Sequence, residues 1–402
     1  MSVLISGIGI AGPTLAYWLS VYGIESTLVE RAPRLRTGGY VIDFWGSGFD
    51  VAERMGLLAD IRRDGYDIKE LRLVNGNGRR VGGFPIEVFR TLTRGRYVSI
   101  PRSDLAKNIF RKLEGRCETI FGDSIRAMEQ TSNGVEVTFE HAAPRRFDLV
   151  IGADGLHSVV RQLAFGAEER FEKFLGLRVA AFEAAGYPAR DEDVFVSHSA
   201  PGKQVGRFSL RNQRTLFLFI FTDDGQSPVD AFDTRTHKDI LRAQFGDMGW
   251  ECPQILAAMA ACDDVYFDRV SQIRMDHWHR GRVGLIGDAA FCPSFLAGQG
   301  SALAMVAAYV LAGELGRARL DPEAALRRYE SQLQGFISGK QTAAVKLAGS
   351  FAPRTRFGLF LRNQITRAFA LPGVPRLLMG SSLTDAFALP DYRAEPGIVK
   401  GS

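Results

Sequence analysis

Residues 3–12, VLISGIGIAG, decide the fold of this 402-residue chain. An apolar run ends there in a G-x-G-x-x-G turn, helix-forming residues follow from Pro13 to Tyr22, and a β-rich run extends from Ile24 to Val29. Strand, glycine turn, helix and strand make a βαβ unit, and the two strands of such a unit lie parallel in one sheet. The stretch therefore predicts a Rossmann-like α/β domain.

The glycine turn also predicts a dinucleotide site. Gly7, Gly9 and Gly12 allow a tight turn whose backbone N–H groups approach a pyrophosphate at the helix N-terminus, where peptide dipoles favour negative charge. Glu30 ends the second strand, eighteen positions after Gly12, where a carboxylate can accept both ribose hydroxyls. This unit alone leaves FAD and NAD(P) open as the nucleotide.

The pattern changes along the rest of the chain. Strand and helix patterns alternate between residues 98 and 165, and three β-rich runs follow at 194–198, 205–210 and 216–222. Those runs, divided by Gly, Pro, Asn and Asp, predict an antiparallel sheet in a second layer or domain. From Pro322 to about Leu378 the residues favour helix.

Composition excludes several classes of protein. The net charge of +5 comes from 50 Lys and Arg against 45 Asp and Glu, without the dense basic block expected of a nucleic-acid surface. Four scattered cysteines predict free thiols in a reducing compartment. The sequence shows neither a secretory leader nor an apolar run of about 18 residues, so we expect no membrane span and a cytoplasmic location. Oligomeric state is left open.

Two further motifs identify a family. IGADGLHSVVR at residues 151–161 follows an apolar strand, and GLIGDAA at 284–290 is followed by Pro293 and by Gly298-Gln299-Gly300 at the start of a helix. With the first loop, they resemble the D-G and G-D motifs of class A FAD-dependent monooxygenases, the family of p-hydroxybenzoate hydroxylase. Aromatic-polyketide hydroxylases and tetracycline-inactivating enzymes look most similar. The resemblance extends from residue 1 to about 380.

The resemblance implies roles for specific residues. Asp288 would bind a ribityl hydroxyl of FAD, and the Gly298–Gly300 turn would aim a helix N-terminus at the flavin, with Pro293 in the same motif. Positive dipole there would stabilise the charge on reduced flavin. Further cofactor contacts are implied for Arg31 near the adenosine, Gly39 and Asp43 beside the isoalloxazine, Arg102 near the phosphate and ribityl chain, and Asp154 and Arg161 of the D-G motif.

The resemblance also implies a fold and an activity. A glutathione-reductase-type FAD-binding domain would comprise residues 1–72, 97–170 and 276–320, a substrate-binding β-sheet domain 73–96 and 171–275, and a C-terminal helical region 321–402. NADPH or NADH would reduce FAD, and a flavin C4a-hydroperoxide would transfer one oxygen atom from O₂ to a small aromatic or polyketide-like substrate. Because the flavin carries the chemistry, no catalytic side chain and no metal is assigned.

Other functions have to be weighed against this one. A non-oxygenating reductase of the same fold stays open, and a non-catalytic dinucleotide-binding protein is disfavoured by the intact Asp288 motif. A flavin halogenase would carry a Trp-x-Trp pair, which the four tryptophans do not form. A plain NAD-dependent dehydrogenase would have no reason to carry the G-D motif.

Several weaker signals have two interpretations each. His277-x-His279 could bind a metal, but no third ligand lies nearby, which favours a structural role. Phe217, Phe219 and Phe221 share one strand face, either as core or as the lining of a substrate pocket. Cys292 is either a small buried filler or a thiol close to the flavin.

The C-terminal region raises one more alternative. Between Gly339 and Gly380, apolar residues are interleaved with Arg354, Arg356 and other arginines, as in a basic amphipathic helix. Such a helix either packs its apolar stripe on its own domain or lies on a membrane surface. The first interpretation is the more common one.

Overall fold

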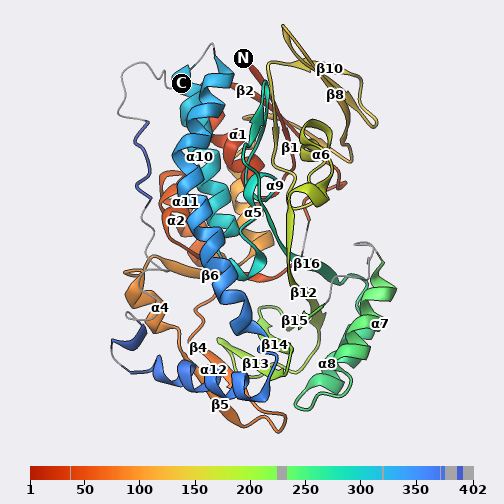
Figure 1. Cartoon of the computed structure of the whole chain (residues 1–402), viewed down its shortest axis with the longest axis vertical. Helices are drawn as coiled ribbons and strands as arrows, with labels where there is room; N and C mark the ends of the chain where they lie inside the picture. Colours follow the sequence, from red (N-terminus) through yellow and green to blue (C-terminus); the bar gives the residue numbers. More distant parts are fainter. Residues whose placement is uncertain (37, 224–232, 319–320, 372, 376–386, 393–402) are drawn as a thin grey trace.

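The computed structural model describes the chain except residues 37, 224–232, 319–320, 372, 376–386 and 393–402. Two sheets divide the molecule along its long axis, with the N-terminal βαβ unit in the upper half and a second sheet in the lower half (Figure 1). This arrangement confirms the predicted α/β fold with a second β-sheet layer and C-terminal helices. The predicted domain boundaries stay a prediction.

The upper sheet is parallel apart from one edge pair. Its strands follow the order β17 (His279–Arg280), β18 (Val283–Leu285), β11 (Leu149–Gly152), β1 (Ser2–Ser6), β2 (Glu25–Glu30) and β7 (Glu118–Phe121). Only β17 and β18 pair in the antiparallel sense. Val3, Leu4 and Ile5 have no accessible surface, as expected where helices cover both faces of a parallel sheet.

Helices and a small sheet surround this upper sheet. Helix α1 packs on α10, and α10 packs on α11 and α2. The elements are α1 (Ala11–Val21), α2 (Ser47–Arg54), α3 (Leu58–Asp64), α5 (Arg102–Arg111), α6 (Val159–Phe165), α9 (Asp288–Phe291), α10 (Gly300–Ala318), and a three-stranded sheet of β8 (Ile125–Thr131), β9 (Gly134–Phe139) and β10 (Arg145–Phe147). Among the described helices only α10 is long and apolar enough to cross a bilayer, and 83% of it is buried, as in a core helix.

The lower sheet has seven strands. They follow the order β16 (Tyr266–Ile273), β12 (Glu172–Ala185), β15 (Arg214–Thr222), β14 (Lys203–Leu210), β13 (Val194–Ala200), β4 (Glu70–Val74) and β5 (Arg80–Pro85). All neighbours pair antiparallel except β4 and β13, which pair in parallel. The long chain segment between those two strands supplies the crossover that a parallel pair requires. A separate two-stranded antiparallel ribbon consists of β3 (Val41–Trp45) and β6 (Tyr97–Pro101). It lies between the two sheets (Figure 1), and its strands come just before β4 and just after β5 in the chain.

The outer face of the lower sheet is covered by two helices that the β-rich pattern did not predict. Helices α7 (Thr234–Phe245) and α8 (Cys252–Ala260) pack there against Phe217, Phe219 and Phe221, whose exposure is 2% or less. Phe219 meets the ring of Phe245 at 4.8 Å. These phenylalanines are therefore core, and the interpretation that they line a substrate pocket is wrong.

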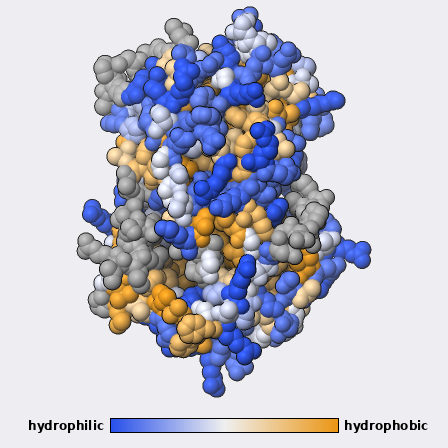
Figure 2. Space-filling model, viewed as in Figure 1, coloured by the Kyte–Doolittle hydropathy of each residue, from blue (hydrophilic) through white to orange (hydrophobic). Residues whose placement is uncertain are grey.

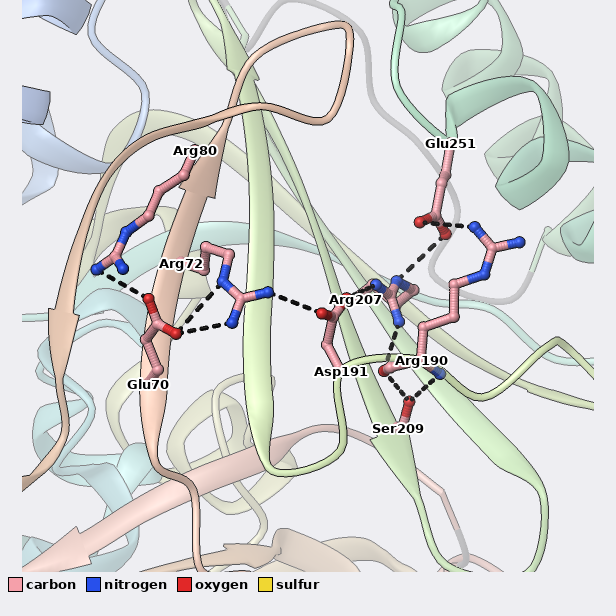
Figure 3. Close-up of polar contacts among 8 residues, drawn as sticks. All are labelled: Glu70, Arg72, Arg80, Arg190, Asp191, Arg207, Ser209 and Glu251. Carbon is pink, nitrogen blue, oxygen red and sulfur yellow. Dashed lines mark hydrogen bonds and ion pairs between the residues drawn. The ribbon is translucent and has the colours of Figure 1, made fainter.

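An ion-pair network ties β4 to the same outer face (Figure 3). Arg207, with a side chain that is 2% exposed, lies 2.7 Å from Asp191 and 3.2 Å from Glu251. Asp191 also accepts a hydrogen bond from Arg72 at 2.7 Å. Burial by itself would raise the pKa of the Asp191 carboxyl, but the two guanidiniums hold it below its usual value. Because the residues come from β4, β14 and loops, the network joins strands that are distant in sequence.

The C-terminal helices connect the two halves. Helix α11 (Pro322–Phe351) runs along the upper half, and α12 (Arg356–Ala368) crosses beneath the lower sheet, close to β5 (Figure 1). The short elements α4 (Glu87–Leu92), η1 (Glu168–Arg170) and η2 (Phe295–Ala297) complete the described structure. Helix is confirmed up to Ala368, and beyond it residue 372 and residues 376–378 of the predicted region lie outside the described residues.

Candidate functional site

A cleft lies where the three motifs converge. It encloses about 890 Å³ of space, including the part open to solvent. Its walls include Gly9 from the first motif, Ala153 and Gly155 from the second, and Asp288 and Gly300 from the third. The cleft extends to the lower sheet through residues of β16, so a ligand here contacts both layers.

The first glycine loop closes tightly against the second motif. Gly7 has φ +106°, and a Cβ there would lie 2.5 Å from the carbonyl oxygen of Ala153. A Cβ on Gly12 would lie 2.1 Å from the carbonyl oxygen of Gly7. Both distances are far below van der Waals contact, so the loop needs glycine at these two positions. The N-terminus of α1 is thereby left open at the cleft.

Glu30 braces this loop. Its carboxylate accepts hydrogen bonds from the backbone N–H groups of Ile8 at 2.9 Å and Ala32 at 3.0 Å, and Arg36 lies 3.5 Å away. The predicted position at the end of β2 is confirmed. Arg31 is exposed beside it. Contacts of both residues with adenosine stay a prediction.

Arg102 and Arg269 line the cleft, and Arg102 is the one beside the glycine loop. It begins α5, its backbone N–H donates to Tyr40, and its guanidinium lies 3.8 Å from where a Cβ on Gly9 would stand. Within the described ranges, no carboxylate lies within ion-pair distance of Arg102. A guanidinium held over an open helix N-terminus without a counter-charge suits an anionic ligand such as a pyrophosphate.

Asp288 supplies a carboxylate to the same cleft. It begins α9 after Gly287, which has φ +61°, and one carboxylate oxygen lies 3.5 Å from where a Cβ on Gly300 would stand. Burial raises the pKa of the Asp288 carboxyl, and the charge of Arg102 opposes that effect. Cys292 also lines the cleft, and burial raises the pKa of its thiol well above the usual value. Cys292 is therefore both buried and part of the cleft wall.

Two buried glutamines hold the turn after α9, and the sequence reasoning missed both. Gln341 of α11 donates to the carbonyls of Phe291 at 3.1 Å and Cys292 at 3.3 Å, and Gln272 of β16 donates to Pro293 at 2.9 Å. Ser294 follows with φ +104°, a backbone conformation that non-glycine residues rarely adopt. These distant contacts fix the turn and so place the Gly298–Gly300 segment at the cleft.

Ala153 and Gly155 of the D-G motif line the cleft, whereas the side chains of Asp154 and Arg161 point into the protein. Asp154 accepts hydrogen bonds from the Ser158 hydroxyl at 2.5 Å and the Val160 N–H at 3.1 Å. Arg161 is fully buried and donates to the carbonyl of Ala289 at 3.1 Å. Neither side chain lines the cleft. Both side chains have protein partners, and a direct cofactor contact by Asp154 or Arg161 stays a prediction.

The ribbon of β3 and β6 carries Asp43 on the side away from the upper core. Its Oδ1 accepts hydrogen bonds from the hydroxyls of Tyr97 at 2.5 Å and Ser99 at 2.7 Å. The side chain is solvent-accessible, yet surrounding protein atoms raise the pKa of the Asp43 carboxyl. That combination is expected of a carboxylate in a concave surface. Gly39 precedes the ribbon with φ +113°.

The aromatic side chains near the cleft come from both layers. Tyr40 lies 4.7 Å from Phe295 and 5.8 Å from Tyr266, measured between ring centroids, and all three line the cleft. Burial raises the pKa of Tyr40 to about 12, so its hydroxyl stays protonated at neutral pH. Tyr40 and Tyr266 belong to a larger cluster of partly buried aromatic side chains. We call its six members the aromatic group: Tyr40, Tyr66, Phe89, Tyr97, Phe195 and Tyr266.

The histidine pair has a structural partner. His277 and His279 both contact the carboxylate of Glu330, at 2.8 Å and 2.9 Å. The described residues contain no group of three or more metal-ligating side chains. The structural role favoured for the pair agrees with this geometry.

A nucleotide with a pyrophosphate and a polar chain fits the cleft. The guanidinium of Arg102 lies beside the glycine loop at the N-terminus of α1, and Asp288 offers hydrogen-bond acceptors in the same cleft. In FAD, the pyrophosphate needs the first kind of group and the ribityl hydroxyls need the second. We infer that these residues would hold FAD.

Comparisons with known proteins agree with an FAD site in this cleft. A family model described as an FAD binding domain matches residues 1–336. An uncharacterized protein of Mycobacterium tuberculosis is 39% identical over 349 residues, which cover 85% of this chain and 91% of the relative. A flavin-dependent monooxygenase of Legionella longbeachae is 31% identical over 395 residues, covering 98% of this chain and 99% of the relative.

A solved structure is similar over nearly the whole chain. The crystal structure of the tetracycline destructase Tet(51) superposes with a TM-score of 0.82 at 31% identity. The superposition covers 97% of this chain and 99% of that one. The similarity therefore includes the lower sheet and the C-terminal helices as well as the cleft.

Proposed function

This chain belongs to the FAD-binding-domain family of flavin-dependent monooxygenases, and from that premise we propose that it uses NADH or NADPH and O₂ to add one oxygen atom to a small aromatic or polyketide-like molecule. The family and the FAD cofactor predicted from the three motifs are confirmed. When bound, FAD supplies the redox and oxygen chemistry. The chain has to bind it, orient it and exclude water.

Arg102 is the observation that carries the proposal. It makes no ion pair with a described carboxylate and lies beside the glycine loop, in the cleft that Asp288 also lines. Removing a charged group from water is costly unless a ligand compensates it. The bound nucleotide would supply that compensation, so the apo cleft is arranged for an anion.

The side chains around the cleft have separate tasks in this proposal. The α1 N-terminus and Arg102 bind phosphate, and Asp288 accepts the hydroxyls of the ribityl chain. The N-terminus of α10, which starts at Gly300, directs its dipole to the flavin and favours negative charge there. The glutamine pair Gln272 and Gln341 keeps this turn in place.

The aromatic group supports the proposed substrate class. Two of its rings line the cleft, Tyr40 just before β3 and Tyr266 of β16, and the other four belong to the same partly buried cluster. Flat rings stack on or meet such side chains edge to face. Tet(51) is named a tetracycline destructase, and a tetracycline is a fused-ring molecule of this chemical class. We propose that the substrate ring system lies there.

The carboxylate of Asp43 is hydrogen-bonded to this group through Tyr97. Tyr97 and Ser99 both donate to its Oδ1, which leaves Oδ2 without a hydrogen bond from any described residue. In our proposal Oδ2 accepts a hydrogen bond from a substrate hydroxyl. This places Asp43 at the substrate, beside the isoalloxazine position that the resemblance implied.

A screen tests the proposed function. The purified, FAD-loaded chain is mixed with NADH or NADPH and a panel of phenols, anthraquinones and tetracyclines, and nicotinamide oxidation is followed at saturating O₂. We expect at least one compound to accelerate oxidation and to gain one oxygen atom by mass spectrometry. Nicotinamide oxidation that yields no oxygenated compound in any reaction would instead favour the non-oxygenating reductase.

The cytoplasm is the proposed location. All four cysteines are free thiols, and two of them, Cys252 and Cys292, are buried. Unpaired thiols are usual in a reducing compartment. Nicotinamide cofactors are also supplied there.

A further inference from the structure

Helix α12 exposes an apolar face. Phe357 is 73% exposed, Phe360 58%, Leu361 48% and Ile365 42%, and Leu371 just beyond the helix is 59% exposed. In Figure 2, apolar side chains gather at the lower left of the molecule, where Figure 1 draws α12. We call these five residues the α12 apolar face. Soluble proteins rarely expose large apolar side chains in one cluster without a partner for them.

The opposite face of the helix already has its contacts. Arg362 donates to the Ser199 hydroxyl and to the side-chain Oε1 of Gln204, both at 3.1 Å, and the Thr366 hydroxyl accepts from the Gly83 N–H at 3.1 Å. Phe369 packs on Phe84 with ring centroids 5.2 Å apart. The helix is therefore docked on the lower sheet through one side only. Its apolar stripe does not pack on its own domain, which was the more common of the two interpretations.

Charge is concentrated in the same part of the chain. The 54 residues from 331 to 384 contain no Asp or Glu and seven Lys or Arg. Because the whole chain has 50 basic and 45 acidic residues, the remainder has 43 basic and 45 acidic ones. The entire positive excess therefore lies in the segment that contains α12.

Arginines border the α12 apolar face. Arg354, Arg356 and Arg367 are exposed at the start and near the end of the helix. Among the residues that the structure describes, none of the three has a carboxylate within ion-pair distance. In a bilayer the acyl chains lie beneath the phosphates. The apolar side chains at the centre of the face could therefore contact acyl chains while the arginines at its border contact phosphates.

We propose that α12 docks this enzyme on an anionic lipid bilayer, with the apolar face at the boundary of headgroups and acyl chains and the three arginines on lipid phosphates. The surface of the cytoplasmic leaflet is negative, which suits the proposed location. A second copy of the chain fits less well. A symmetric contact would bring identical basic borders together, and like charges would repel.

Vesicle flotation tests this docking. The full-length, FAD-loaded protein is mixed with vesicles of phosphatidylcholine plus phosphatidylglycerol, or of phosphatidylcholine alone. We expect it to float with the anionic vesicles and to remain below with the neutral ones, and raised salt should release it. A protein that floats with neither kind of vesicle would overturn the proposal.

Two variants assign the binding to α12. In one, Phe357→Gln, Phe360→Gln and Leu361→Gln are combined, and we expect the partition coefficient to fall at least about tenfold. In the other, Arg354→Gln, Arg356→Gln and Arg367→Gln are combined, with an expected loss of about fivefold per arginine. All six side chains are exposed, so flavin content and Tm should match those of the unmodified protein.

Control variants carry substitutions of the same kind at exposed positions outside α12. Leu163→Gln removes an exposed apolar side chain from α6, and Arg62→Gln, Arg126→Gln and Arg146→Gln together remove three exposed arginines from the upper half. These controls should keep vesicle binding within about twofold of the unmodified protein. Equal losses in controls and α12 variants would refute the assignment to α12. So would a dimer, measured by light scattering without lipid, that the apolar variant dissociates.

Discussion

Arg102→Gln should weaken FAD binding without weakening the fold. The guanidinium lies over the glycine loop, 3.8 Å from the Cβ position of Gly9, where it would donate to a phosphate oxygen. A hydrogen bond to a charged group contributes about 1.5–3 kcal/mol. Its loss corresponds to a Kd that is about ten- to 150-fold higher. The quenching of flavin fluorescence on titration of FAD into apoprotein measures this Kd.

The same substitution makes a second prediction for the empty protein. Burial disfavours the Arg102 cation, but Tyr40 and Asp288 favour it enough to raise its pKa, and glutamine breaks no ion pair with a described carboxylate, so the Tm of the apoprotein should change little. Arg269→Gln is the matched control, because Arg269 lines the same cleft but already pairs with Glu172 at 3.3 Å. An unchanged Kd for Arg102→Gln, or an equal loss in the control, would refute the phosphate role of Arg102.

Three further outcomes follow from the geometry. Gly12→Ala places a Cβ 2.1 Å from the Gly7 carbonyl, so fluorescence titration should show FAD affinity at least about tenfold lower; full affinity would contradict the loop argument. Arg207→Met removes one of the two guanidiniums that pair with Asp191 and a partner of Glu251, and should cost about 1–3 kcal/mol of stability, seen as a lower Tm, whereas an unchanged Tm would mean the network is dispensable. Asp268 and Glu168 raise the pKa of His157 to about 10, above the usual value of about 6.5. This contribution to stability is complete below pH ~6.5 and disappears as the pH rises through 10, so His157→Gln should lower Tm at pH 6 but not at pH 10.

Local patterns predicted the parts of the fold that depend on near neighbours. The run Gly134–Phe139 forms β9 with the same bounds, and the glycine loop lies between β1 and α1 as expected. Helix α7 was missed although Asp233 caps it and His237, Leu241 and Phe245 recur every fourth residue on its buried side. That signal was present in the sequence, within a region whose surrounding pattern is β-rich.

Other features depend on contacts between distant segments. Strand β12 was missed because Gly176 and a register shift between Phe174 and Arg178 interrupt its alternation. The resemblance implied a cofactor contact for Arg161, which stays a prediction, and the structure adds that its guanidinium donates to the carbonyl of Ala289, 128 positions further along the chain. Gln341 lies 49 positions from Cys292, and no local pattern marks it as a support for the cleft. The direction of such side chains is fixed only when the tertiary structure forms.

The most direct test of the central claim is the fate of molecular oxygen. The FAD-loaded enzyme is supplied with NAD(P)H, a compound that stimulates its oxidation, and oxygen-18 gas in ordinary water. We expect the product to contain one oxygen-18 atom from the gas. A product labelled only from water, or NAD(P)H oxidation that gives hydrogen peroxide and leaves every compound unchanged, would contradict the monooxygenase reaction.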